Sequence, residues 1–167
     1  MAILEQITPE NASAFKTTRL QALQDSPTAF GSTYAKESQL SDGDWFKRAD
    51  DWTSNRSIGY LAMASGEPCG IVAAFLGEDD PRQAHLVSMW VAPAHRRSGV
   101  GRILIEAIRA WAVKKEAHLL RLTVTSNNLS AIEFYQRNSF SMTGNTEPYP
   151  NDPSLIEYEM TRFVKNQ

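Results

Sequence analysis

The segment from residue 84 to residue 125 constrains the fold most, because three apolar stretches follow one another there with short connections. Ala84 to Val91 has the composition of a strand, residues 99–115 carry apolar side chains at helical spacing, and residues 119–125 form an apolar, β-branched strand. A strand–helix–strand unit is joined by a right-handed crossover, which makes its two strands parallel. We therefore expect a parallel pair of strands with a helix packed on one face.

The remaining segments predict antiparallel strands and further helices around this pair. Residues 3–7 alternate as a strand, a helix capped by Thr8 runs to about Leu23, and residues 57–64 and 69–76 form a hairpin. A short helix and two strands should complete the chain, at residues 130–138, 140–145 and 155–163. The predicted fold class is α/β (α+β), a mixed and mostly antiparallel sheet with helices on both faces.

Composition favours one globular domain. The chain has 167 residues, of which 42% are hydrophobic and 22% charged, and its formal net charge is −2. This balance argues against a nucleic-acid-binding protein, and the single Cys69 excludes an internal disulfide and a multi-cysteine zinc site. The N-terminus does not resemble a secretory signal, and no run of about 18 apolar residues occurs. We expect a cytoplasmic protein without a membrane segment.

The connection between strand and helix carries the first candidate site. Pro93 ends the strand, and the loop places Gly99 and Gly101 two residues apart directly before the helix. Glycines let a ligand approach the backbone, and the unpaired N–H groups of a helix N-terminus favour an anion such as phosphate. The spacing fits neither a Walker P-loop nor G-x-G-x-x-G. Three cationic side chains surround the loop: Arg96, Arg97 and Arg102.

A second motif lies after the next strand. The loop reads R-x-x-G-x-G from Arg96 to Gly101 behind a V-x-P strand end, and residues 128–140 read N-L-S-A-I-E-F-Y-Q-R-N-S-F. In this order the two motifs resemble the acetyl-CoA-binding motif and the N-x-x-A-x-x-F-Y-x-x-x-G-F motif of the GNAT superfamily of N-acetyltransferases. The one departure is Ser139 in place of the glycine, and we expect Asn138 to adopt the left-handed conformation that ends the helix.

The resemblance implies one domain over residues 1–167. Residues 56–167 would form the core that binds coenzyme A, and residues 1–55 would carry variable helices on the substrate side. The implied reaction transfers an acetyl group from acetyl-CoA to a primary amine by direct attack in a ternary complex, with no metal. Tyr135 is implied as the catalytic acid that protonates the departing thiolate.

The same resemblance implies the cosubstrate site. Backbone N–H groups of the loop would hold the pyrophosphate, strand groups would bond the pantetheine as an added strand, and one strand N–H would polarise the acetyl carbonyl. Asn128 would contact the pantetheine arm. The implied acetyl-CoA-binding residues are Met89, Trp90, Val91, Arg96, Arg97, Ser98, Gly99, Val100, Gly101, Arg102, Asn128, Ala131 and Tyr135.

The group that deprotonates the acceptor amine stays open between His85, Glu157 and a chain of waters. His85 is also consistent with a surface histidine, and Glu157 with a solvated strand carboxylate. Residues 28–52 and 147–153 are expected to select the acceptor. Acidic and aromatic side chains in the first of these segments could recognise a cationic amine, or could form a solvated acidic face over core tryptophans: Tyr34, Glu37, Asp42, Asp44, Trp45, Asp50, Asp51 and Trp52.

Two other functional classes compete with a transferase. An acyl-CoA-binding sensor module would keep the loop but would not need Tyr135, and a nucleic-acid-binding protein would use the loop arginines together with Arg109. The presence of Tyr135 favours the enzyme. The acceptor could be a protein N-terminus, a lysine side chain, a polyamine or an amino sugar, and the protein could be a monomer or a homodimer.

Overall fold

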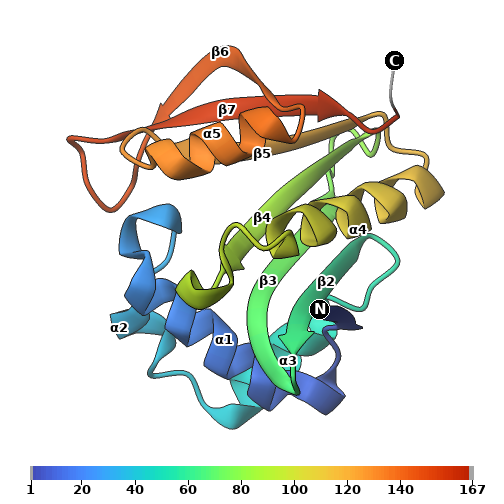
Figure 1. The fold of residues 1–167 in the computed structure, drawn as a ribbon, viewed down its shortest axis with the longest axis vertical. Coiled ribbons are helices and arrows are strands. Elements are labelled where there is room, and N and C mark those ends of the chain that lie inside the picture. Colours follow the sequence, from blue (N-terminus) through green and yellow to red (C-terminus); the bar gives the residue numbers. More distant parts are fainter. Residues whose placement is uncertain (1, 166–167) are drawn as a thin grey trace.

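The computed structural model describes residues 2–165, which form a seven-stranded sheet in the order β1-β2-β3-β4-β5-β7-β6 (Figure 1). Only β4 and β5 pair in parallel, and all other neighbours are antiparallel. The predicted mixed sheet and its parallel pair are confirmed. The strands are β1 (Ile3–Gln6), β2 (Ser57–Ala64), β3 (Glu67–Leu76), β4 (Gln83–Val91), β5 (Leu119–Thr125), β6 (Ser141–Pro148) and β7 (Ile156–Phe163).

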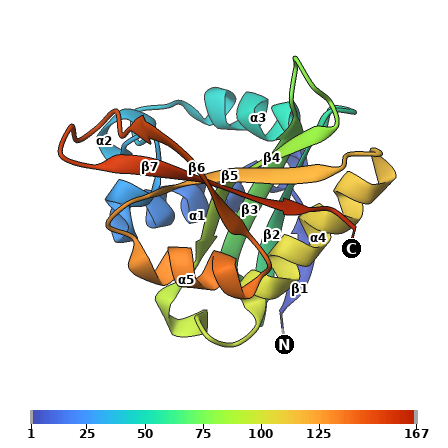
Figure 2. The same cartoon turned by 90° about the horizontal axis from the view of Figure 1, so that it is seen from above.

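Five α-helices cover the sheet, and Figure 2 shows α1 to α3 on one face and α4 and α5 on the other. Their bounds are α1 (Ala12–Asp25), α2 (Tyr34–Glu37), α3 (Asp42–Asp51), α4 (Val100–Lys114) and α5 (Leu129–Arg137). Thr8 begins the first helical segment as predicted, because its side chain accepts from the Glu10 N–H and Asn11 completes the capping box. Pro27 lies two residues beyond the end of α1, where a helix cannot continue.

Each face of the sheet has its own hydrophobic core. On the α4 and α5 face, Leu104, Ile108 and Leu120 are fully buried. On the other face, α1 and α3 meet through Phe15 and Trp45, whose rings pack edge to face at 5.5 Å. The sheet thus separates two apolar layers, which can be connected only where neighbouring strands diverge.

One such gap opens between β4 and β5. The two strands pair only where Gln83–His85 lies beside Leu119–Arg121, and beyond that point they diverge. A bulge in β4 adds to the divergence, since the β3 pairing register shifts between Trp90 and Val87 and Ser88 adopts a φ of 58°. The divergence leaves one edge of β4 without a strand partner, in the region where the sequence predicts the acetyl-CoA site.

Candidate active site

A cleft of about 570 Å³ lies between β4, the loop before α4, and helix α5. It is the meeting place of both sequence motifs, although they are about 30 residues apart in the chain. Its lining residues include Met89, Trp90, Val91, Arg96, Arg97, Gly101, Asn128, Ala131, Phe134 and Tyr135. The structure therefore brings together nine of the residues that the sequence predicts as acetyl-CoA contacts.

Main-chain N–H groups lie at the start of α4, where Gly101 lines the cleft. Gly99 takes the N-cap position of α4 with a φ of 90°, which a residue without Cβ adopts without strain. No side chain caps the helix, and the N–H groups of Val100, Gly101 and Arg102 have no acceptor among the described residues. Three such donors and the helix dipole favour an anion at this position.

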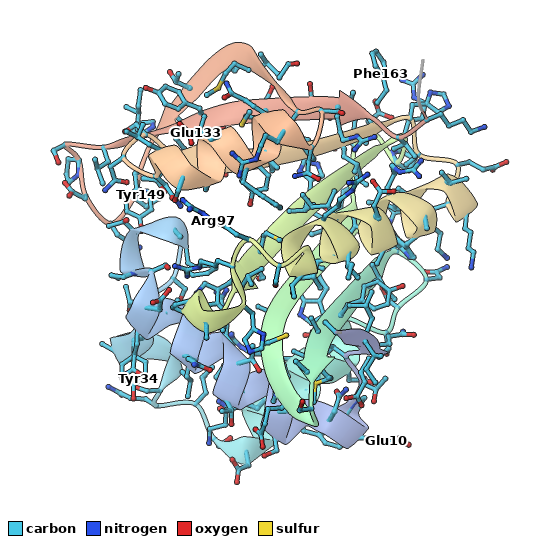
Figure 3. All side chains as sticks on the ribbon, in the orientation of Figure 1. Glu10, Tyr34, Arg97, Glu133, Tyr149 and Phe163 are labelled. Atoms are coloured by element: carbon cyan, nitrogen blue, oxygen red, sulfur yellow. The ribbon has the colours of Figure 1, made fainter. Side chains whose placement is uncertain are left out.

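The side chains of this loop contribute less than its backbone. Val100 is buried in the core, and the Ser98 hydroxyl donates to the His95 carbonyl. Ser98, Gly99, Val100 and Arg102 are not among the residues that line the cleft. Arg97 does line it, and Figure 3 shows this arginine beside helix α5. Of the predicted contacts in this loop, the structure therefore brings Arg96, Arg97 and Gly101 to the cleft.

Gly101 has a second role that its sequence position did not indicate. A Cβ at this position would lie 2.7 and 2.9 Å from two ring carbons of Phe134 on α5. The missing side chain therefore lets α4 and α5 approach each other, in addition to any close approach of a ligand. The family motif places a glycine and an aromatic residue at these positions without showing that they touch.

Arg96 is a loop strut in this structure. Its Nε donates to the Val91 carbonyl at 2.9 Å, and its guanidinium also donates to the Asp25 carboxylate at 2.6 Å. The Trp90 indole N–H donates to the same carboxylate oxygen at 3.0 Å. Burial alone would raise the pKa of Asp25, but hydrogen bonds from Trp90, Ser26 and Arg96 outweigh it and lower that pKa. The Arg96 guanidinium is thus engaged by protein groups.

The backbone of β4 presents alternate groups to the cleft. The Ala92 N–H donates to Cys69 on β3 at 2.8 Å, so strand alternation directs the polar groups of Val91 and Met89 away from β3. It directs those of Trp90 toward β3, and the Trp90 side chain is buried with the α1 and α3 core. Of the three predicted strand contacts, Met89 and Val91 have their backbone turned toward the site, and the Val91 carbonyl is already occupied.

Tyr135 lies on α5 with only 8% of its surface exposed. Its ring packs edge to face against Phe134 and Phe140, at centroid distances of 5.5 and 5.7 Å. Burial raises the pKa of the phenol well above its usual value, so the hydroxyl stays protonated at every pH of interest. None of the hydrogen bonds within residues 2–165 involves this hydroxyl, which leaves its proton available to a ligand in the cleft.

The two ends of α5 differ in how well the sequence predicts them. Asn128 caps the N-terminus by accepting from the Ala131 N–H at 3.3 Å, which leaves its amide N–H₂ free at the cleft. At the C-terminus, the prediction that Asn138 takes the left-handed conformation is wrong. Ser139 takes it with a φ of 73°, because the Asn138 side chain is instead donating to the Phe134 carbonyl at 2.8 Å.

Neither candidate base lines the cleft. The His85 ring stacks on Phe75 at 5.0 Å, and burial together with the nearby Arg121 lowers its pKa. Glu157 lines a separate hollow of about 420 Å³ beside Glu159, on β7. The structure therefore does not bring His85 or Glu157 beside Tyr135.

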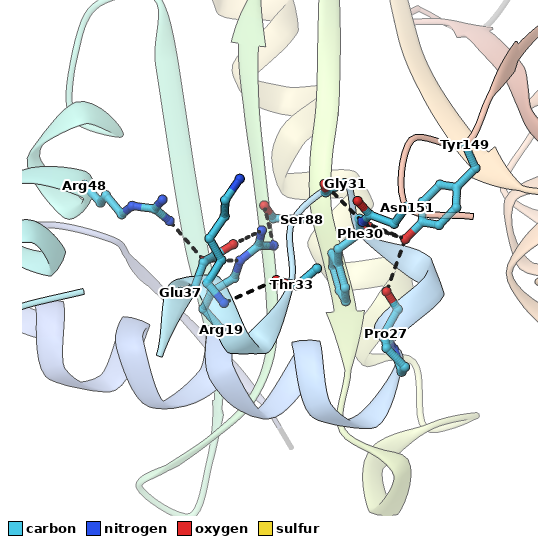
Figure 4. Close-up of polar contacts among 11 residues, drawn as sticks. Arg19, Pro27, Phe30, Gly31, Thr33, Glu37, Arg48, Ser88, Tyr149 and Asn151 are labelled. Carbon is cyan, nitrogen blue, oxygen red and sulfur yellow. Dashed lines mark hydrogen bonds and ion pairs between the residues drawn. The ribbon is translucent and has the colours of Figure 1, made fainter. Parts of the chain in front are cut away.

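The two segments expected to select the acceptor touch each other. The Tyr149 hydroxyl donates to the Phe30 carbonyl at 2.6 Å, and Asn151 donates to the Gly31 carbonyl at 3.2 Å (Figure 4). Thr125 on β5 also donates to the Thr28 carbonyl in the same segment. We call the contacts of Tyr149 and Asn151 with residues 27–31 the latch. It lies across the open end of the β4–β5 gap (Figure 1). Sequence analysis places the two loops on the acceptor side but does not predict that they touch.

The acidic and aromatic residues of the first segment do not gather into a cation site. Trp45 is 1% exposed, and its ring is covered by the chain's own Arg48 at 5.4 Å. Asp44 belongs to the capping box of α3, and Asp42 pairs with Lys16 at the surface. The alternative of a solvated acidic face over a core tryptophan describes Asp42 and Asp44. It is wrong for Glu37, which is 2% exposed and accepts from Arg19 and Arg48. Among the described residues, no group of three His, Cys, Asp or Glu side chains is arranged to hold a metal.

The model of the acetyltransferase (GNAT) family matches residues 20–140, which is most of the chain and includes both motifs. This chain belongs to the GNAT acetyltransferase family. The match ends at Phe140, the last residue of the second motif. Within residues 2–165, no helix has the length and apolar character needed to cross a bilayer.

Solved structures share the fold. A GNAT-family acetyltransferase from Streptococcus pneumoniae is 20% identical with a TM-score of 0.81, over 99% of this chain and 100% of that chain. The yncA protein from Salmonella typhimurium, solved with its cofactor acetyl-CoA, is 13% identical with a TM-score of 0.81, over 100% and 96% of the two chains. Nourseothricin acetyltransferase is 27% identical with a TM-score of 0.62, over 66% of each chain. A comparison with curated proteins finds no match.

Proposed function

We propose that this GNAT acetyltransferase transfers the acetyl group of acetyl-CoA to a primary amine by direct attack in a ternary complex. One observation carries the proposal. Among the described residues, the N–H groups of Val100, Gly101 and Arg102 at the start of α4 have no acceptor, and Gly101 lines the same cleft as the protonated Tyr135 hydroxyl, which has no hydrogen-bond partner there either. The first feature suits a pyrophosphate and the second suits a departing thiolate.

The bound cosubstrate would lie along β4. Its pyrophosphate accepts hydrogen bonds from the N–H groups of Val100, Gly101 and Arg102, and Arg97 adds positive charge at the cleft. Its pantetheine arm follows the unpaired edge of β4 and reaches the amide of Asn128. A β4 N–H group directed into the cleft would stabilise negative charge that develops on the acetyl oxygen.

The chemical step needs one proton donor and one proton acceptor. The amine nitrogen forms a bond to the carbonyl carbon, the carbon–sulfur bond breaks, and the sulfur takes the proton of Tyr135. The tyrosinate then regains a proton from solvent. Because burial disfavours the tyrosinate, the transfer depends on the hydroxyl's position beside the sulfur and not on its acidity. We assign the amine proton to water, because neither candidate base of the sequence, His85 or Glu157, lines the cleft; His95 and Glu133 line it but lie on the loop before α4 and on α5.

The acceptor is proposed as a primary amine that enters from the face covered by α1 and α2, opposite the cosubstrate. Family neighbours include a ribosomal-protein-S18-alanine N-acetyltransferase from Escherichia coli and nourseothricin acetyltransferase, so proteins of this fold include ones named for peptide and for small-molecule substrates. In this proposal the latch borders the entrance.

The test is release of free thiol from acetyl-CoA in the presence of a panel of amines and amino-terminal peptides. The control is Arg97→Glu, which places negative charge at the phosphate end without touching the α4–α5 contact. Amine-dependent release that weakens in the control supports the transferase. Tight acetyl-CoA binding by calorimetry with no release for any amine would support the sensor module instead, and absence of binding would overturn both.

A further inference from the structure

An arginine on the acceptor side connects three parts of the molecule that are far apart in sequence. Arg19, in the middle of α1, donates to the Glu37 carboxylate through Nε at 3.1 Å and through a terminal nitrogen at 3.0 Å. Its other terminal nitrogen donates to the Ser88 hydroxyl at 3.3 Å, and its guanidinium lies 4.9 Å from the Phe30 ring centroid (Figure 4). Arg19 thus joins α2, the β4 bulge and the segment held by the latch.

The anchor of this network is a buried carboxylate. Glu37 is 2% exposed and also accepts from Arg48 at 3.0 Å. Burial alone would raise the pKa of Glu37, but the hydrogen bonds and charge of Arg19 outweigh it and lower that pKa. The buried Glu37 carboxylate cannot move into solvent, and it accepts from two nitrogens of Arg19. This two-point contact fixes the plane of the Arg19 guanidinium. Arg19 itself has a 13% exposed side chain.

The third guanidinium nitrogen points at a strained residue. Ser88 has a φ of 58°, a left-handed conformation that is strained for a non-glycine residue. Its hydroxyl has no other hydrogen-bond partner among the described residues than Arg19. The bulge at this position directs the next residue, Met89, toward the cleft. The direction of the Met89 N–H therefore depends on the conformation of Ser88.

We propose that Arg19 is a positioning residue for acetyl transfer, which holds the left-handed Ser88 so that the Met89 N–H faces the thioester carbonyl. This inference rests on the proposed function for its kinetic consequence. Arg19 touches neither the cosubstrate cleft nor the reacting atoms, and it acts through Ser88. An interaction with the developing oxyanion is made mainly in the transition state, so misdirection of this N–H lowers kcat more than it raises the KM for acetyl-CoA.

The kinetic test is a double-mutant cycle between positions 19 and 88, measured as kcat at saturating acetyl-CoA and amine. Arg19→Lys keeps the charge beside Glu37 but loses the planar fork that reaches Ser88. It should lower kcat about 10-fold to 100-fold, as displacement of a group by a fraction of an ångström does. Glycine adopts a positive φ without strain, so the same substitution should lower kcat less than about 3-fold when Ser88→Gly is already present.

The matched control is Lys16→Gln, one turn earlier on α1, which removes a surface ion pair with Asp42; within the described residues, Lys16 makes no side-chain hydrogen bond or ion pair with β4. It should leave kcat within about 2-fold of the unmodified protein, because exposed pairs contribute little. Thermal unfolding of each variant shows the folded fraction at the assay temperature. An equal loss of kcat for Arg19→Lys in both backgrounds, or a loss that only follows the unfolded fraction, would overturn the inference.

A second measurement does not depend on catalysis. Hydrogen exchange of the β4 amides at residues 87–91 should be faster in Arg19→Lys than in Lys16→Gln, because the bulge is no longer held. Unchanged exchange in Arg19→Lys contradicts the positioning role even if no acceptor is found. Absence of amine-dependent thiol release from the unmodified protein, together with faster exchange in Arg19→Lys, would overturn the proposed function and leave the structural coupling standing.

Discussion

The two sides of the cleft are built in different ways. The acetyl-CoA side uses main-chain groups supplied by consecutive residues, namely the first turn of α4 and the unpaired edge of β4. The acceptor side uses side chains that are far apart in the chain, as Arg19 reaches Ser88 and Tyr149 reaches Phe30. Main-chain donors tolerate substitution around them, whereas a side-chain network fails when one member is lost. The cosubstrate site should therefore be robust and the acceptor side sensitive.

The largest effect is expected for Glu37→Gln, which leaves Arg19 and Arg48 without their buried counter-charge. Loss of one partner of a buried ion pair should lower the free energy of unfolding by about 3–5 kcal/mol, measured by urea unfolding at pH 7. The control is Asp42→Asn in an exposed pair, which should cost less than about 0.5 kcal/mol. Similar losses in the free energy of unfolding for the two variants would contradict the expected sensitivity of the acceptor side.

The difference in the free energy of unfolding between the unmodified protein and Glu37→Gln should also depend on pH. The pKa of Glu37 is lower in the folded than in the unfolded protein, so its stabilisation is complete above the unfolded pKa and is lost as pH falls through the folded one. The gap between the unmodified protein and Glu37→Gln should therefore be widest near neutral pH and narrow in acid.

Gly101→Ala tests a place where the acetyl-CoA side depends on a distant side chain. The added Cβ meets the Phe134 ring, and overpacking should destabilise the fold by about 1–3 kcal/mol. Phe134→Leu in the same chain should recover part of this loss, because the shorter side chain leaves room. If the double variant is no more stable than Gly101→Ala in thermal unfolding, the α4–α5 contact is not the reason for the glycine.

Tyr149→Phe removes the latch hydroxyl and leaves the Phe30 carbonyl with only a long contact of 3.5 Å from Asn151 in place of its 2.6 Å donor. An unsatisfied buried acceptor costs about 1–3 kcal/mol, which urea unfolding should show. Loss of the latch should also raise the KM for the amine while the affinity for acetyl-CoA changes little. Tyr34→Phe, at an exposed tyrosine of α2, is the control and should change stability by less than about 0.5 kcal/mol. Equal stability of the two variants would argue against a latch.

The smallest expected effect is a gain in stability. Ser139→Gly restores the glycine that ends the second motif elsewhere in the family, at a φ of 73°. Relief of left-handed strain should stabilise the protein by about 1 kcal/mol, visible as a higher Tm. No gain would mean that a hydrogen bond at this turn already compensates the strain. Ser65→Gly offers a comparison at another left-handed serine, in a hairpin turn outside the cleft.

The sequence predicted those features that depend on local chemistry. Strand periodicity, the Thr8 cap and the two glycines define elements within a few residues, and the crossover rule then gives the parallel pair. The strut between Arg96 and Asp25 and the network of Arg19 depend on side chains that meet only after folding. The charge and type of Arg96 and Arg19 do not indicate which residues they contact, since every arginine in the chain could equally have been solvated.

Tyr135→Phe tests most directly the claim that this cleft carries out acetyl transfer. The substitution removes the proposed proton donor but keeps the buried ring between Phe134 and Phe140. Single-turnover transfer to the amine found in the panel should slow by about 10²-fold or more, while the Kd for acetyl-CoA by calorimetry stays within about 2-fold. An unchanged rate with unchanged affinity would show that the thiolate leaves without Tyr135, and would contradict the proposed mechanism.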